Sequence, residues 1–213
     1  MHRVLNIILA SQSQRRKELL KRAGMVFDAI TPDVEEIDIP DRPEDTVRLN
    51  SVAKAEWGRR SYPDSVIIGA DTVVFLDRIM GKPETMSQAR QMLIELSGRT
   101  HSVYTAVTVI LPSGRFTATE VALSRVTVKN LDDDVISEYF RSVNPLDKAG
   151  GYAIQEYGDI LIEDCSGSLS NVIGLPLGIL GEMLGKHPET GEYMDMLNRA
   201  EQKISNAVGG LIR

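Results

Sequence analysis

The segment SVIIGADTVVFL, residues 65–76, most constrains the fold, because it places a carboxylate inside an apolar run. Two β-rich stretches flank Gly69-Ala70-Asp71-Thr72, and this pattern predicts a buried strand that an acidic residue interrupts. An ionised carboxylate in such surroundings is costly unless it is paired or binds a metal ion. Asp71 is therefore a functional candidate, and the alternative is a strand-end aspartate that hydrogen-bonds the backbone of a turn.

The start of the chain predicts a strand, a small polar loop and an amphipathic helix. The apolar run Val4–Ala10 reads as the strand and Gln14–Ala23 as the helix, with Leu19, Leu20 and Ala23 inward and Gly24 as its C-terminal stop. A second strand is expected around residues 25–31.

Arg15 and Arg16 fall in the first turn of this helix, where backbone N–H groups already present positive charge. Together with Ser11 and Ser13, two guanidinium groups supply the donors that a phosphate needs. Equally, Ser13 reads as an ordinary N-cap and the arginines as solvated surface charge.

The rest of the chain mixes helices and strands without strict alternation. The acidic segment 32–45 contains three prolines and predicts a surface loop. After it we expect a helix from Pro43 to about Arg60 with Val47, Val52 and Ala53 inward, and a second helix over 86–97 that ends at Gly98. A hairpin over 100–130 follows, and then a helix that is capped by Asn130 or Asp132 and runs through Phe140. The last expected elements are a loop with two strands over 147–168, a helix containing Leu175-Pro176-Leu177, and a polar C-terminal helix. The predicted class is α/β with α+β character and a mixed or largely antiparallel sheet.

Composition limits the function classes. The 213 residues, with 42% hydrophobic and 25% charged content, suit one globular domain, and no apolar run approaches the roughly 20 residues that cross a bilayer. The net charge of −6 argues against a protein that coats nucleic acid, but it allows a small anionic ligand where basic groups are local. The single cysteine, Cys165, cannot form an internal disulfide and agrees with a cytoplasmic location.

Other candidate residues are weak when taken singly. Lys54, Lys82 in a Gly-Lys-Pro turn, and Glu35-Glu36 each read first as solvated charge. The three histidines show no metal-ligand spacing, and no P-loop, dinucleotide fingerprint or nucleophile elbow is present.

In their order and spacing, several blocks between about Ile7 and Gly178 resemble the Maf family, nucleoside triphosphate pyrophosphatases named for an effect on bacterial septum formation. These blocks are LASQSQRRKELL, VEE, SVAKAE, GADTVV, GKP, LSGRTHSVYTAV, DKAGGYAIQ and VIGLPLG. The resemblance implies one domain over residues 1–213 with an elongated two-lobed fold, related to inosine triphosphate pyrophosphatases, that has a mixed sheet and a central cleft. A homodimer is a further expectation at the level of the family.

The resemblance also assigns roles to residues. Asp71 matches the proton acceptor, and it is expected to act with Lys54 and Lys82 in catalysis. The substrate-binding set is Ser11, Arg15, Arg16, Lys54 and Lys82. A divalent cation, Mg²⁺ or Mn²⁺, is expected to bind through Glu36 and Asp71, and Gln155 completes the polar lining of the cleft.

Three positions point to one substrate branch. Arg15, Thr72 and Gln155 match the branch that prefers dTTP and UTP, whereas the branch that acts on 7-methyl-GTP typically has tryptophan, glutamine and glutamate there. Gln12 and Gln14 depart from the usual loop pattern, which has a small residue and a proline at these places. The alternatives are a pyrophosphatase for CTP, a modified pyrimidine nucleotide or 7-methyl-GTP, and a non-catalytic nucleotide sensor or septum-associated regulator.

Overall fold

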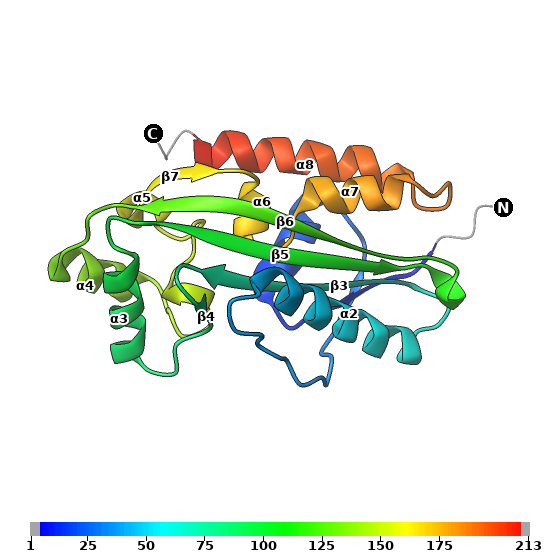
Figure 1. Cartoon of the computed structure of the whole chain (residues 1–213). Helices are drawn as coiled ribbons and strands as arrows, with labels where there is room; N and C mark the ends of the chain where they lie inside the picture. The colour runs from blue at the N-terminus through cyan, green and yellow to red at the C-terminus, as the bar shows by residue number, and fades with distance from the viewer. Residues whose placement is uncertain (1–4, 210–213) are drawn as a thin grey trace.

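A computed structural model describes residues 5–209 of the chain as an elongated α/β structure (Figure 1). Its strands are β1 (Ile7–Ala10), β2 (Asp28–Ile30), β3 (Val66–Phe75), β4 (Ile79–Met80), β5 (Thr100–Ile110), β6 (Thr117–Val128) and β7 (Ile162–Ser166). They form one seven-stranded sheet in the order β2-β1-β3-β5-β6-β7, with β4 paired to β3. β1 is parallel to β2 and β3, and the other pairs are antiparallel. The predicted fold class and mixed sheet are confirmed.

Helices cover both faces of the sheet. They are α1 (Gln14–Ala23), α2 (Pro43–Ser61), α3 (Met86–Leu96), α4 (Asp133–Ser142), α5 (Gly158–Leu161), α6 (Leu169–Ile173), α7 (Leu177–Gly185) and α8 (Glu192–Gly209), with short 3₁₀ turns η1 (Pro112–Gly114) and η2 (Ala149–Gly151). Figure 1 shows α2 below the long strands and α7 and α8 above them, while α3 and α4 lie at the far end of the molecule. No helix within residues 5–209 is long and apolar enough to cross a membrane.

The alternation of side chains along the strands divides the core between these two faces. Ile8 and Ile67 pack with Ala55 of α2, whereas Leu9 and Ile68 belong to the larger cluster that the other helices close. The strands that are covered by helices on both faces of the sheet have continuous apolar sequences, because neither of their faces contacts water.

Several sequence predictions are confirmed at the level of single residues. α1 has the predicted limits, and Gly24 ends it in the left-handed region at φ 85°. Asp132, rather than Asn130, caps α4 by accepting a hydrogen bond from the Val135 N–H. β3 continues through Asp71 without a break.

Other predictions are wrong. Segment 147–168 contains one strand, β7, because Gly150 adopts φ 70° and the chain turns through η2 and α5 before it extends. The helix expected around Leu175-Pro176-Leu177 begins at Leu177, because Leu175 precedes a proline, which disfavours the helical conformation there, and Pro176 is the extended N-cap. The predicted start of the first strand, Val4, lies outside the described residues.

The buried face of α2 also differs from the prediction. Val47 is buried as expected, but Val52 and Ala53 are half-buried, and the inward face continues through Ser51, Lys54 and Ala55. This face carries polar groups because it lies against the part of β3 that holds Asp71.

Gly69 allows α2 to lie directly on β3. A Cβ atom at Gly69 would come 2.5 Å from the Ser51 carbonyl oxygen and 2.7 Å from the Ala55 nitrogen. Both are backbone atoms of α2, so a side chain at position 69 requires the helix to move.

We expect Gly69→Ala to destabilise the protein by about 2 kcal/mol, the usual cost of overpacking a closed interface. The midpoint of urea unfolding measures this change. Gly81→Ala is the matched control, because nothing lies within 4 Å of its Cβ position. Equal stability of the two variants would contradict the close packing of α2 on β3.

His101 links the sheet to the segment after η2. Its side chain is 2% exposed, and its Nε2 lies 2.6 Å from the Tyr152 hydroxyl. Burial lowers the pKa of His101 from 6.5 to about 4, so the imidazole is neutral in the folded protein at neutral pH.

This depressed pKa predicts lower stability in acid. Between pH 6.5 and 4 the unfolded chain binds a proton at His101 that the folded chain does not, so stability falls as the pH falls through this window. The protonation of His101 alone is expected to lower the free energy of unfolding by about 2 kcal/mol between pH 7 and pH 5. The change in unfolding free energy over this range should be smaller by that amount in His101→Gln, and an unchanged pH dependence would contradict the assignment.

Candidate active site

The predicted site residues converge on one cleft of about 480 Å³. The β1–α1 loop, the acidic loop, α2, β3 and the segments around residues 147–155 and 172–174 form its walls. The cleft is lined by every residue that the sequence analysis assigned to catalysis, substrate or metal: Ser11, Arg15, Arg16, Glu36, Lys54, Asp71, Thr72, Lys82 and Gln155.

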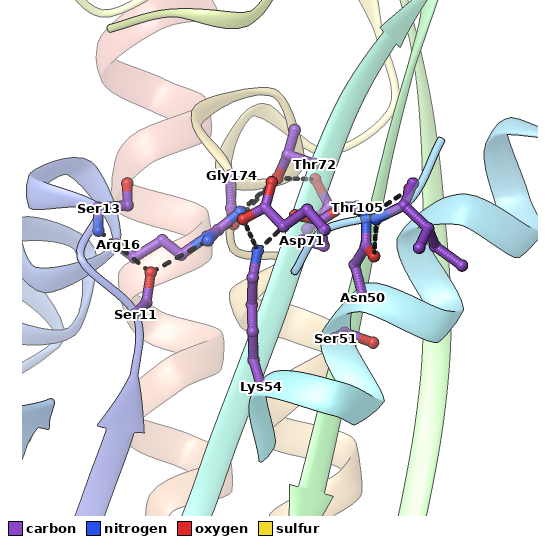
Figure 2. A network of polar contacts seen from close by, with 12 residues as sticks. Ser11, Ser13, Arg16, Asn50, Ser51, Lys54, Asp71, Thr72, Thr105 and Gly174 are labelled. Atoms are coloured by element: carbon purple, nitrogen blue, oxygen red, sulfur yellow. Dashed lines mark hydrogen bonds and ion pairs between the residues drawn. The ribbon is translucent and has the colours of Figure 1, made fainter. Parts of the chain in front are cut away.

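Asp71 lies at the buried base of the cleft with both carboxylate oxygens engaged. Its side chain is on the face of β3 that α2 covers, and the residue is 5% exposed. Lys54 Nζ lies 2.7 Å from Oδ1, and Asn50 Nδ2 donates to Oδ2 at 3.1 Å (Figure 2). The buried charge is thus paired, as burial requires. The alternative of an aspartate bonding a turn backbone is wrong, because Asp71 stands within β3 and contacts side chains.

Lys54 connects Asp71 to the acidic loop. The residue is 6% exposed, and its Nζ also lies 2.7 Å from Glu36 Oε1. Burial acts to raise the pKa of Glu36, but the hydrogen bond and charge of Lys54, with the charges of Lys82 and Arg16, bring it below its ordinary value. Glu36 and Asp71 therefore present two carboxylates around one ammonium group.

Arg16 joins three elements at the opposite wall. Its Nε donates to the Gly174 carbonyl at 2.7 Å, Nη1 to Ser11 Oγ at 3.1 Å and Nη2 to Thr72 Oγ1 at 2.9 Å. Figure 2 shows the guanidinium reaching from α1 between Ser11 and Gly174. Burial lowers the pKa of Arg16, and the negative charge of Asp71 opposes this effect. Because a guanidinium carries five N–H groups, two remain for a ligand.

The N-terminus of α1 keeps its polar groups available. The Ser13 side chain makes no capping hydrogen bond, and the Ser13 N–H donates to Ser11 Oγ at 3.2 Å. Ser13 therefore stands at the predicted N-cap position but does not cap the helix through its side chain. Arg15 is half-buried, with one Nη1 contact of 3.4 Å to the Asp147 carbonyl, and the exposed Gln12 and Gln14 line the same cleft.

The remaining predicted residues lie at the rim or in a wall. Lys82 and Gln155 are exposed, and no carboxylate of the described residues lies within 4.0 Å of the Lys82 ammonium. The Thr72 hydroxyl faces inward to Arg16 and Thr105, whose Oγ1 is 2.9 Å away. Lys82 and Gln155 are thus exposed residues of the cleft lining, whereas the Thr72 hydroxyl is bound to Arg16 and Thr105.

Sequence reasoning missed Asn50, Thr105 and the Gly174 carbonyl. Asn50 had a local signal, because it precedes Lys54 by four residues and therefore shares its helix face. The other two had none, since only the pairing of β3 with β5 and the fold of the segment after α6 bring them to Thr72 and Arg16.

The acidic side chains suit a cation that comes with its own additional ligands. Residues 5–209 hold no group of three His, Cys, Asp or Glu side chains able to bind a metal ion. Glu36 and Asp71 both line the cleft and each contacts Lys54 Nζ, and Mg²⁺ is commonly bound by one or two carboxylates together with substrate phosphates and water. The donor set fits a cation shared with a polyphosphate.

Comparisons with known proteins show which family the chain resembles. The family described as "Maf-like protein" matches residues 6–187. A dTTP/UTP pyrophosphatase of Akkermansia muciniphila is 46% identical over 173 residues, which are 80% of this chain and 90% of that protein. A dTTP/UTP pyrophosphatase of Thermotoga maritima is 41% identical over 183 residues, 84% of this chain and 88% of that protein.

Two solved structures are more distantly similar. The Ham1 protein of Staphylococcus aureus has a TM-score of 0.43 at 15% identity, covering 58% of this chain and 71% of that one. A nucleoside-triphosphatase / dITP/XTP pyrophosphatase of Mycobacterium abscessus has a TM-score of 0.40 at 15% identity, covering 60% and 76%. The family match over residues 6–187 and the identities above 40% carry the conclusion that this chain belongs to the Maf family.

Proposed function

We propose that this protein is a nucleoside triphosphate pyrophosphatase that hydrolyses dTTP and UTP to the nucleoside monophosphate and pyrophosphate. The observation that carries the proposal is the Asp71–Lys54–Glu36 cluster, in which Asp71 and Lys54 are buried, and which shares one cleft with Arg15, Arg16 and Lys82. The names of relatives above 40% identity support the same reaction and substrates.

Four cations and the N-terminus of α1 would hold the triphosphate. Arg15 and Arg16 lie at this N-terminus, where backbone N–H groups add to their charge. Lys54 and Lys82 approach from α2 and from the loop after β4. Such preorganised donors stabilise the charge that develops on phosphoryl oxygens in the transition state.

Asp71 would orient the attacking water and accept its proton. Its carboxylate is fixed from two sides by Lys54 and Asn50, so it has little freedom to turn away from a substrate. A positioned carboxylate is effective here because phosphoryl transfer depends mainly on alignment and electrostatics.

Glu36 and Asp71 are the residues that we propose to hold Mg²⁺ or Mn²⁺. When bound, a divalent cation would neutralise negative charge of the triphosphate. Lys54 Nζ lies between the two carboxylates, 2.7 Å from an oxygen of each.

Substrate preference is assigned to Arg15, Thr72 and Gln155. Gln155 is exposed on a segment that lines the cleft, and its amide offers both a donor and an acceptor to a pyrimidine edge. Thr72 would act indirectly, because its hydroxyl is bound to Arg16 and Thr105.

We expect Gln155→Glu to lower kcat/KM for dTTP and UTP by about tenfold, the effect of losing one hydrogen-bond donor and placing a charge at the base edge. Relative kcat/KM values for UTP, CTP and 7-methyl-GTP measure the change in preference. An unchanged ranking of these nucleotides would contradict a role of Gln155 in reading the base.

A panel of nucleoside triphosphates with Mg²⁺ or Mn²⁺, followed by pyrophosphate release, tests the proposed function. Release from dTTP and UTP supports it, and preferred release from CTP or 7-methyl-GTP would identify the other substrate branches. Binding without release from any nucleotide would identify a sensor.

We further propose a cytoplasmic homodimer that removes non-standard nucleotides or affects cell division, and light scattering on the purified protein tests the dimer.

A further inference from the structure

Three polar residues follow one face of α2 at successive helical turns: Thr46, Asn50 and Lys54, here called the α2 ladder. All three are buried, and each binds the acidic loop that runs alongside. Thr46 Oγ1 accepts from the Ile39 N–H at 2.9 Å, Asn50 binds Ile37, and Lys54 binds Glu36. The ladder thus holds this irregular segment against the helix.

Asn50 makes the fullest use of its hydrogen-bonding groups. Its Oδ1 accepts from the Ile37 N–H at 3.0 Å, and its Nδ2 donates both to the Ile37 carbonyl at 3.0 Å and to Asp71 Oδ2 at 3.1 Å. Both amide hydrogens are therefore committed.

The contacts with Ile37 also determine which way the amide faces. A flipped amide would set its NH₂ group against the Ile37 N–H and its oxygen against the Asp71 carboxylate, and both pairs repel. The backbone of the acidic loop thereby ensures that an N–H donor, and not an oxygen, faces Asp71 (Figure 2).

We propose that Asn50 is a positioning residue that couples the acidic loop to the Asp71 carboxylate. This inference rests on the proposed function. Lys54 holds Asp71 Oδ1 and Asn50 holds Oδ2, so the two contacts together fix the plane of the carboxylate. Because Ile37 adjoins Glu36, the same amide places the second carboxylate of the site. A loss of the Asn50 donor should therefore reduce turnover more than nucleotide binding.

Asn50→Asp is the principal test, because it keeps the size of the side chain and an acceptor for the Ile37 N–H. It removes the donor to Asp71 and to the Ile37 carbonyl, and it adds a negative charge beside Asp71. We expect kcat for dTTP to fall by about 30-fold or more, with KM changed by less than about threefold, in the range of a lost positioning contact. Asn50→Ser is the second variant, since it adds no charge and its hydroxyl is too short to span Ile37 and Asp71. Asn50→Ser should likewise lower kcat strongly and change KM only slightly.

Thr46→Val is the matched control. Thr46 is buried on the same helix face and binds the same loop one turn away, but it makes no hydrogen bond to Asp71. All variants are assayed well below their melting temperatures. If Asn50 served only to hold the loop, Thr46→Val and both Asn50 variants would lose kcat equally, and that result would overturn the proposal. A wild-type kcat in both Asn50 variants would overturn it as well. Absence of pyrophosphate release by the wild-type protein itself would instead refute the proposed function, and with it any role of Asn50 in turnover.

Discussion

Asp71→Asn is expected to lower kcat for dTTP and UTP by about 10³-fold while nucleotide binding is retained. Asparagine has the shape of aspartate but cannot accept a proton from water, and it removes one of the two carboxylates proposed to hold the cation. Arg15, Arg16 and Lys82, which line the cleft and are proposed to hold the triphosphate, are unchanged. Pyrophosphate release measures turnover, and calorimetry with a non-hydrolysable triphosphate analogue measures binding.

Glu35→Gln is the matched control for this change. Glu35 lies in the acidic loop beside Glu36, but it is not among the residues that line the cleft. It also loses one carboxylate charge and should keep kcat within about twofold, in line with other changes away from special contacts. Normal turnover by Asp71→Asn would show that the catalytic centre lies elsewhere.

Lys54→Met is expected to cost both stability and activity. It leaves Asp71, whose side chain is 8% exposed, without its ammonium partner, and removing one member of a buried ion pair costs about 3 kcal/mol or more. Glu36 suffers less, because its side chain is 58% exposed and can turn to water. We expect kcat to fall by about 10²-fold, the usual effect of one lost electrostatic contact in a transition state.

Lys82→Met separates these two effects. Lys82 lines the same cleft but is exposed, and the described residues give its ammonium no carboxylate within 4.0 Å. Its loss should leave the unfolding free energy within about 0.5 kcal/mol and act mainly on KM. If urea unfolding showed equal stability for the two lysine variants, the buried pair at Asp71 would contribute nothing to the fold.

Local sequence patterns predicted the elements that depend on neighbours along the chain. The stop of α1 at Gly24, the cap of α4 at Asp132 and the buried β3 run all follow from short-range chemistry. The second strand expected in segment 147–168 failed for the complementary reason. Its composition is β-like, but Gly150 packs against Val74 of β3 in a turn that only the tertiary structure requires.

For the site, the sequence by itself determined which residue types are available for binding and catalysis, and it placed one group of them close together. Ser11, Arg15 and Arg16 are neighbours in any structure that forms α1, and the carboxylate of Asp71 needs a partner wherever its strand is buried. The sequence alone therefore offered a phosphate-binding loop as one of two equal interpretations and predicted a functional aspartate.

Only the tertiary structure decided which residues of the site form ion pairs and hydrogen bonds with one another. Lys54 and Asp71 are 17 residues apart, and they meet because Gly69 lets α2 approach β3 closely. Arg16 meets Gly174 across 158 residues, and Asn50 is aimed at Asp71 by the backbone of an irregular loop. The physical reason is that such contacts depend on helix packing, strand register and hydrogen bonding between distant segments, which residue order does not encode locally.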